Sequence, residues 1–239
     1  MPIRKDIFEI KSPKFAQGLT LQLKSLRNAR NVRMWLAPSG ILSVTKPFYV
    51  SKAEALKFVD DNSEWIIGQL ASFKRPETLG EWLERNPVYS KSGPMKVWLR
   101  PRGSEFFVSD MERAEVVFSY AGEISLRKVF VKFSREYSEK LAFELSHESG
   151  LAFSGVSVRN QSSRWGSRST SGLISLNWRL PLLPYELQKY IVCHELCHAA
   201  FMDHSQSFWI FLNRLCPGAK RLDARLSKEG EKIFKLARD

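Results

Sequence analysis

The sequence predicts an α+β protein, with a β-rich N-terminal region over residues 1–120 and a more helical region over residues 121–239. Two observations support this fold class. In the first region, short segments alternate apolar and polar residues, which is the pattern of half-buried strands. In the second region, apolar residues recur at helical spacing over longer stretches. The chain has 239 residues, which is enough to bury a substantial core, and it contains no internal repeat.

The N-terminal region begins with predicted strands. The segment 19–24 alternates apolar and polar residues, and so do residues 32–36 and 42–44. The turn residues Pro38, Ser39 and Gly40 lie between the last two segments, so we predict a β-hairpin there. Further short strands are predicted over residues 95–99, 105–108 and 115–118.

One helix is predicted within this β-rich region. Ser51 is followed three residues later by Glu54, which is the spacing of a capping box. The helix that it begins should extend to about Phe73. Its buried stripe is predicted to contain Leu56, Val59, Ile66, Ile67 and Leu70.

The second region is dominated by predicted helices. Apolar residues at helical spacing predict an amphipathic helix over residues 123–148. Pro184 is well placed at the first position of a later helix, which should extend to about Phe201. The remaining predicted elements are strands at 155–159 and 172–178, a hairpin across Ser169–Gly172, and a helix at 206–215.

Composition indicates a cytoplasmic protein. The N-terminus is charged and lacks the apolar core of a signal peptide, and no apolar run is long enough to cross a membrane. The three cysteines, Cys193, Cys197 and Cys216, are too few and too irregular for a disulfide framework. We interpret Cys193 and Cys197 as small buried residues.

The formal net charge of +12 favours contact with polyanions. Nucleic acid is therefore one candidate partner, and a basic solvated surface without a partner is the alternative. Several of the cations are concentrated near the C-terminus, namely Lys220, Arg221, Arg225, Lys228, Lys232 and Lys235.

An H-E-x-x-H motif, His194-Glu195-Leu196-Cys197-His198, lies within the helix predicted after Pro184. Residues four apart share one face of a helix, so both imidazoles can reach one metal ion. Glu195 is rotated by about 100° from His194, so it can reach a metal-bound water without being a ligand. Imidazole nitrogens suit zinc, and a catalytic zinc keeps three protein ligands and one water.

His204 is the candidate third ligand. It can join the first two histidines only if the helix ends between about Ala199 and Asp203. Ser205 supports such an end, because it is a suitable N-cap for the next helix. The spacing equals that of H-E-x-x-H-x-x-G-x-x-H enzymes, but Phe201 replaces their glycine and no Met-turn is evident. The alternative is that His204 only hydrogen-bonds a ligand or caps a helix.

The motif and its surroundings resemble the YgjP-like metallopeptidases, which are relatives of the SprT-like and WLM zincins. The matching segments are Arg164-Trp165-Gly166-Ser167, Ile174–Leu180, Leu183–Leu187, His194–His198 and His204–Trp209. The resemblance implies a zincin-like α+β catalytic domain and a zinc site of three histidines. It also implies that Glu195 is the catalytic acid and base.

One position departs from the family pattern, because Arg168 replaces its usual cysteine. The substitution removes a thiol and adds a charge near the site. Arg164 is a candidate for stabilising an oxyanion, and the alternative is a structural Arg-Trp stack in which Gly166 eases a hairpin turn. His147 ends an earlier predicted helix, where we interpret it as structural.

The motif and the basic charge together leave three candidate functions. The first is a zinc metallopeptidase, whose peptide substrate would add a strand to the sheet near Gly172–Trp178. The second is a metal-dependent hydrolase of nucleotide phosphoanhydrides, which the basic charge suits but no Gly-rich phosphate loop supports. The third is a non-catalytic nucleic-acid-binding protein whose structural zinc would need four protein ligands. The sequence does not define an oligomeric state.

Overall fold

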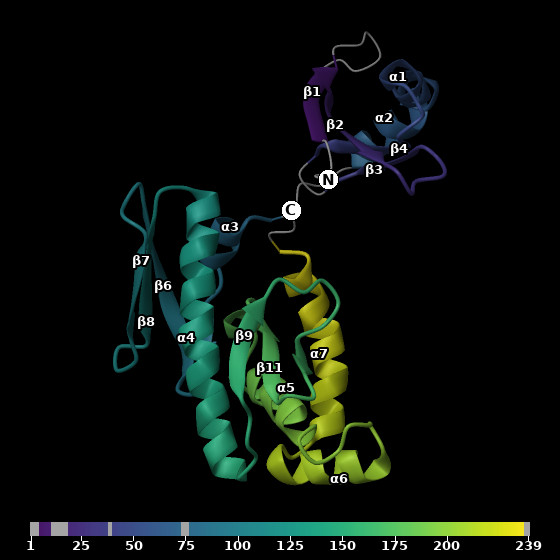
Figure 1. Cartoon of the computed structure of the whole chain (residues 1–239). Coiled ribbons are helices and arrows are strands. Elements are labelled where there is room, and N and C mark those ends of the chain that lie inside the picture. The colour runs from purple at the N-terminus through teal and green to yellow at the C-terminus, as the bar shows by residue number, and fades with distance from the viewer. Residues whose placement is uncertain (1–4, 11–18, 38–39, 73–76, 237–239) are drawn as a thin grey trace. The chain divides into compact units, whose positions relative to one another are not determined.

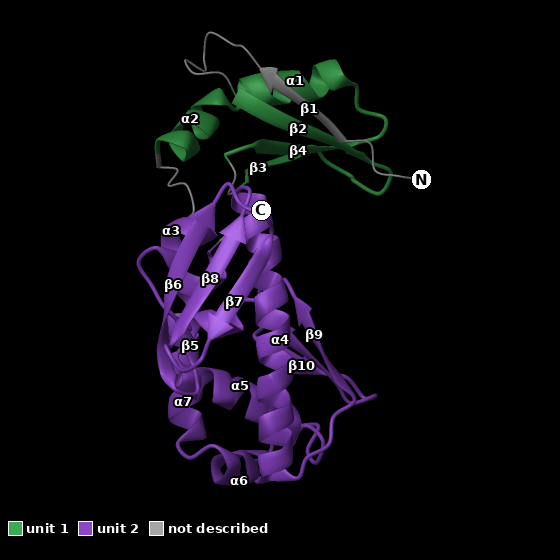
Figure 2. Ribbon diagram, turned by 90° about the vertical axis from the view of Figure 1, so that its left-hand side faces the viewer, with its two compact units in different colours: residues 1–76, 237–239 green, residues 77–236 purple. Residues whose placement is uncertain are grey.

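The computed structural model describes residues 5–10, 19–37, 40–72 and 77–236 and contains two compact units (Figure 2). The first unit extends to Pro76, and the second is Glu77–Leu236. The boundary predicted near residue 120 falls inside the second unit, between a strand and the long helix that covers it. That strand and helix share one core, since Phe118 contacts the ring of Phe130 at a centroid distance of 5.3 Å.

The first unit is a four-stranded sheet with two helices. Its elements are β1 (Lys5–Ile10), β2 (Leu19–Leu26), β3 (Arg33–Leu36), β4 (Leu42–Pro47), α1 (Lys52–Asp61) and α2 (Ser63–Ser72). The strand order is β1-β2-β4-β3, in which β2 and β4 are parallel and the other pairs antiparallel. The hairpin of β3 and β4 is therefore confirmed, although Pro38 and Ser39 of its turn lie outside the described residues.

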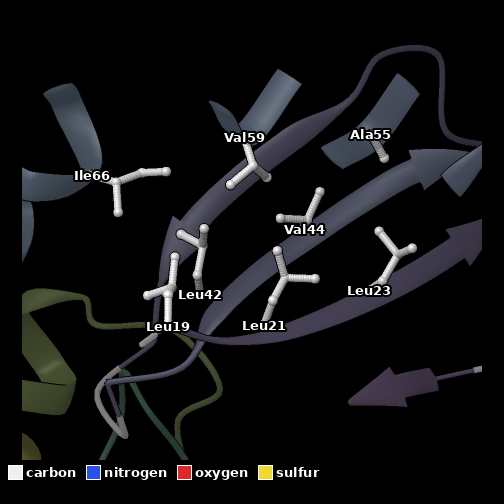
Figure 3. Packing of buried hydrophobic residues seen from close by; sticks show 8 residues of the cluster. All are labelled: Leu19, Leu21, Leu23, Leu42, Val44, Ala55, Val59 and Ile66. Atoms are coloured by element: carbon white, nitrogen blue, oxygen red, sulfur yellow. The ribbon is translucent and has the colours of Figure 1, made fainter. Parts of the chain in front are cut away.

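Leucine and valine side chains of β2 and β4 form the core of this unit with the two helices (Figure 3). The buried cluster contains Leu19, Leu21, Leu23, Leu42, Val44, Ala55, Val59 and Ile66. The alternation seen in β2 is what places its leucines on the helix-covered face of the sheet.

The single helix predicted after Ser51 is wrong in one respect, because it breaks at Asn62. The capping box is present: Glu54 N donates to Ser51 Oγ at 3.1 Å, and Ser51 N donates to the Glu54 carboxylate at 2.7 Å. The Asn62 side chain, however, donates to the carbonyl of Phe58 at 2.8 Å and ends the first helix. Ile67, which was predicted in the buried stripe, is 46% exposed.

The second unit contains two sheets, one long helix and a C-terminal group of helices (Figure 1). Its strands are β5 (Val88–Ser90), β6 (Gly93–Pro101), β7 (Phe106–Asp110), β8 (Glu115–Tyr120), β9 (Gly155–Arg159), β10 (Gly166–Arg168) and β11 (Leu173–Asn177). Its helices are α3 (Leu79–Leu83), α4 (Glu123–Ser149), α5 (Tyr185–Cys197), α6 (Gln206–Leu215) and α7 (Ala219–Phe234), with a short 3₁₀ turn at Leu180–Leu182. The sheet orders are β5-β6-β8-β7 and β10-β11-β9. The predicted α+β fold is confirmed.

Helix α4 connects the two sheets of this unit, because it packs against β8, β9 and α5 (Figure 1). Its buried residues recur every three or four positions, as predicted from the sequence, and include Phe130, Phe133 and Leu141. Gly150 ends the helix in the left-handed conformation, with φ of 70°, which favours glycine.

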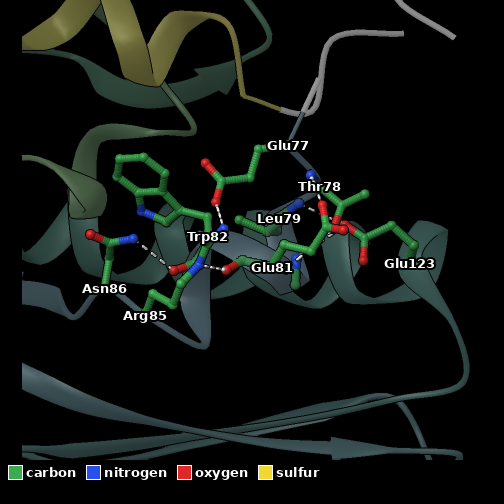
Figure 4. A network of polar contacts seen from close by, with 9 residues as sticks. Glu77, Thr78, Leu79, Glu81, Trp82, Arg85, Asn86 and Glu123 are labelled. Atoms are coloured by element: carbon green, nitrogen blue, oxygen red, sulfur yellow. Dashed lines mark hydrogen bonds and ion pairs between the residues drawn. The ribbon is translucent and has the colours of Figure 1, made fainter. Parts of the chain in front are cut away.

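The start of the unit is hydrogen-bonded to α4 through Glu123 (Figure 4). The backbone N–H groups of Leu79 and Gly80 donate to Glu123 Oε1 at 2.8 and 3.3 Å. A capping box of Thr78 and Glu81 satisfies the remaining N–H groups at the same end of α3. The first turn of α3 therefore has partners for the donors that a helix start leaves free.

Candidate metal centre

Helix α5 carries the H-E-x-x-H motif and ends earlier than predicted. It terminates at Cys197, and His198 is the C-cap residue, whereas the sequence suggested an end near Phe201. Three turn hydrogen bonds follow: Ala199 N donates to Leu196 O at 2.9 Å, and the N–H groups of Ala200 and Phe201 both donate to Cys197 O at 3.0 Å. The chain thus leaves the helical path before His204, as a third ligand requires.

The next helix begins where the sequence predicted. Ser205 is the N-cap of α6, with extended φ and ψ of −64° and 172°. Its side chain makes no capping hydrogen bond, so that part of the prediction is wrong. The Ser205 N–H group instead donates to Asp203 Oδ1 at 3.4 Å, and this contact holds the turn that carries His204.

The turn brings His194, His198 and His204 together. One ring nitrogen from each lies within 4.8 Å of the others, and the Nε2 atoms of His194 and His204 are 3.0 Å apart. Phe208 of α6 is fully buried beneath them, with its ring 4.8 to 5.0 Å from all three imidazole centroids. The cluster is therefore built from the end of α5, the following turn and the first turn of α6.

Hydrogen bonds orient two of the imidazoles. His198 Nδ1 lies 2.8 Å from the carbonyl oxygen of Phe201, so it carries the proton and leaves Nε2 free. His194 Nδ1 lies 3.5 Å from the hydroxyl of Tyr190, which donates its own proton to Asp223 Oδ1 at 2.8 Å. The Tyr190 oxygen can thus accept the His194 Nδ1 proton, which leaves Nε2 of that ring unprotonated as well.

The electrostatics of the cluster suit metal binding. Burial, together with the nearby His198 and His204, lowers the pKa of His194 to about 4. A neutral imidazole offers the lone pair that a metal ion needs. Three imidazole nitrogens at this separation, two of them with defined tautomers, fit one divalent ion.

Glu195 lies beside the cluster and is 6% exposed. It packs against the backbone of β10, since a Cβ placed on Gly166 would lie 2.5 Å from Glu195 Oε1. Burial raises the pKa of Glu195 to about 7, and the charges of Arg164 and Arg168 lower it in part. Gly166 is a strand residue beneath the carboxylate, so its expected role in easing a turn is wrong.

The edge strand nearest the site is β10. The sequence suggested that a substrate strand would add near Gly172–Trp178, but β11 lies between β10 and β9 and is paired on both sides. The free edge therefore belongs to Gly166–Arg168, the strand that covers Glu195. Arg168 is fixed there by donating from Nη2 to the carbonyl of Ala152 at 2.9 Å.

Several other predicted residues have structural roles. Trp165 is buried against Phe234 of α7, with ring centroids 4.3 Å apart. Cys193 and Cys197 are buried free thiols, as predicted, and burial raises the pKa of each to about 12. His147 is exposed in the last turn of α4 and lies outside the histidine cluster.

Two contributors to the site were missed by the sequence analysis, Tyr190 and Asp223. Tyr190 lies one helical turn before His194, a spacing that could have indicated contact. Asp223 lies on α7, an element that the sequence analysis did not predict, and no local pattern connects it to α5.

An α+β unit with a histidine cluster beside a buried glutamate is the arrangement expected of a metallopeptidase site. The family model described as YgjP-like, metallopeptidase domain, matches residues 30–229, and the chain belongs to this family. The resemblance stated from the sequence is therefore confirmed. No curated protein matches the chain.

Among solved structures, the chain is similar to the metallopeptidase zymogen abylysin of Pyrococcus abyssi. The two are 28% identical, with a TM-score of 0.36. The similarity covers 38% of this chain and 93% of the abylysin chain. In the described part of the molecule, no helix has the length and apolar character needed to cross a membrane.

Proposed function

We propose that this protein is a zinc-dependent peptidase in which His194, His198 and His204 hold the zinc and Glu195 is the general base. The observation that carries the proposal is the convergence of three imidazole nitrogens within 4.8 Å beside a buried carboxylate. Nitrogen ligands favour zinc over magnesium or calcium, which prefer oxygen. Membership of a metallopeptidase family supports the peptide bond as the target.

The number of ligands favours catalysis over a purely structural zinc. A structural site is closed by four protein ligands, whereas a catalytic site keeps one position open. Among the described residues, no fourth histidine, cysteine or carboxylate belongs to the cluster. Cys193 and Cys197 are buried in the core and are not part of it.

Glu195 is suited to moving a proton. When bound, zinc lowers the pKa of a water ligand and polarises the carbonyl of the substrate. The Glu195 carboxylate, whose pKa is about 7, would hold the proton given up by the attacking water and would pass it to the leaving amine. The packing of Glu195 against Gly166 fixes the position from which its oxygen acts.

The free edge of β10 supports the binding of an extended peptide. Its unpaired backbone groups can hydrogen-bond a substrate strand, which would then lie across Glu195. A substrate bound in this way would present a peptide bond, rather than a nucleotide phosphate, to Glu195. The phosphoanhydride alternative gains no support, since the cluster contains no carboxylate ligands for a magnesium nucleotide.

Replacement of Glu195 by glutamine tests the proposal. We expect Glu195→Gln to keep its zinc and to lose about 10²- to 10⁴-fold in the rate of peptide hydrolysis. Glu186→Gln is the matched control, because Glu186 is an exposed carboxylate on the same helix that pairs with Arg225. The assay combines metal analysis with cleavage of an internally quenched peptide library. Full activity of Glu195→Gln, or an equal loss in Glu186→Gln, would contradict the assignment.

A further inference from the structure

A groove is lined by residues of α6, by the α6–α7 connection and by the start of α7. We call it the α6–α7 groove; its volume is about 790 Å³, and the lining residues that matter here are Trp209, Ile210, Asn213, Arg214, Lys220 and Arg221. Trp209 is a neighbour of both the groove and the histidine cluster, because its ring centroid lies 6.4 Å from that of His204 and 6.5 Å from that of His194.

The groove is positively charged. It is lined by Arg214, Lys220 and Arg221 and by no aspartate or glutamate. All three cations are exposed, and within the described residues none of them forms an ion pair. The Nζ atom of Lys220 lies 5.8 Å from the centre of the Trp209 ring, so its charge faces an apolar part of the groove.

Two other C-terminal cations, one within α7 and one at its C-cap, differ from these. Arg225 is paired with Glu186 and Glu229, and Lys235 is paired with Glu231. Two of the C-terminal cations are thereby matched by carboxylates. Lys220, Arg221, Lys228 and Lys232 form no ion pair within the described residues, and of these four Lys220 and Arg221 line the α6–α7 groove.

The walls of the groove are held in place. Asn213 Oδ1 accepts hydrogen bonds from the N–H groups of Gly218 and Ala219 at 2.9 and 3.4 Å. These bonds fix the connection between α6 and α7, and with it the backbone that presents Lys220. On the floor, Ile210 is 50% exposed, which offers apolar contact to the stem of a bound side chain.

We propose that the α6–α7 groove binds an acidic stretch of the polypeptide substrate, so that cleavage favours peptides with glutamate or aspartate near the scissile bond. This inference rests on the proposed peptidase function. Its basis is charge complementarity in a groove whose Trp209 ring lies 6.4 Å from the His204 ring. Three cations and one aromatic ring are few for nucleic acid, whose binding proteins commonly neutralise about 6 to 10 phosphates.

The first test measures binding without turnover. Zinc-loaded Glu195→Gln protein is titrated with a fluorescein-labelled peptide containing a run of glutamates, and with its counterpart containing glutamines. We expect the glutamate peptide to bind about fivefold to tenfold more tightly at low salt, as two or three exposed ion pairs would give. The difference should shrink as ionic strength rises, because exposed charges are screened.

Variants test whether the preference for the glutamate peptide depends on the cations of the groove. Adding Lys220→Gln and Arg221→Gln together should bring the two peptides to equal affinity. The matched control is Lys228→Gln with Lys232→Gln, which removes the same charge from the same helix outside the α6–α7 groove and should preserve the preference. Equal binding of the two peptides to the parent protein, or a preference that survives loss of Lys220 and Arg221, would overturn the inference.

A labelled single-stranded oligonucleotide tests whether nucleic acid, rather than an acidic peptide, occupies the groove. Tighter binding of the oligonucleotide than of the glutamate peptide, lost in the Lys220 and Arg221 variant, would overturn the inference in favour of nucleic acid. The outcome for the groove can be distinguished from the outcome for the peptidase assignment. Absence of peptide cleavage with the binding preference retained contradicts only the proposed function, whereas cleavage without the preference contradicts only the groove assignment.

Discussion

The two faces of α6 differ in what they contact. The inner face presents Phe208 and Leu212, which are fully buried, and Phe208 packs beneath the three histidines. The outer face presents Ile210 and Asn213 to the α6–α7 groove, where the neighbouring charges are exposed. Packing on a buried aromatic ring fixes the geometry that chemistry needs, whereas exposed charges supply attraction that salt weakens. We therefore assign catalysis to the inner face and substrate preference to the outer face.

Removal of the metal should distinguish the functions of the two faces of α6 most clearly. We expect dialysis against a chelator to abolish peptide hydrolysis and added zinc to restore it, because zinc supplies the activated water. Binding of the glutamate peptide in preference to the glutamine peptide should survive, since no groove residue is a metal ligand. Anisotropy measured before and after chelation gives the comparison. Hydrolysis that persists in metal-free protein, or a peptide preference that disappears with the metal, would contradict this division of functions between the two faces.

The second prediction concerns the packing of Glu195 on β10. We expect Gly166→Ala to reduce hydrolysis by about a hundredfold, because the new Cβ displaces the carboxylate that must be aligned with the water. Zinc content and groove binding should not change. Gly68→Ala on α2 is the control, since a Cβ there meets nothing within 4 Å. Wild-type activity in Gly166→Ala would mean that the position of Glu195 is not limiting.

The third prediction concerns the support of His194. Tyr190→Phe removes the hydroxyl that lies between His194 and Asp223, and we expect about a 10- to 100-fold loss of zinc affinity. The control is Tyr137→Phe, which removes another partly buried hydroxyl that donates to Gln188 at 2.6 Å. Competition with a chromophoric chelator measures both variants. Equal zinc affinities in the two variants would remove Tyr190 from the site.

The convergence of the three histidines was largely predictable because its main signal is local. The spacing of His194 and His198 places both on one helical face wherever α5 packs, and His204 needed only a helix end nearby. The contacts of Glu195 with Gly166, and of Tyr190 with Asp223, join residues about 30 positions apart on different elements. No periodic pattern encodes such contacts, so they became visible only in the folded chain.

The charge of the groove was less predictable for a related reason. The sequence showed a basic C-terminal segment, but neutralisation of Arg225 depends on Glu186, which lies on a different helix. Helix α7 itself was not predicted, although Leu222, Leu226 and Ile233 recur at helical spacing and are buried. The break at Asn62 was missed because a single side-chain hydrogen bond outweighed a continuous apolar stripe.

The most direct test of the central claim is the zinc content of purified wild-type protein beside His194→Ala, His198→Ala and His204→Ala. His147→Ala is the control, since that histidine is exposed and outside the cluster. We expect about one zinc per chain in the wild type and in His147→Ala, and weak or no retention in the other three variants. A full complement of tightly bound zinc in His204→Ala would contradict the three-histidine site and place the third ligand elsewhere.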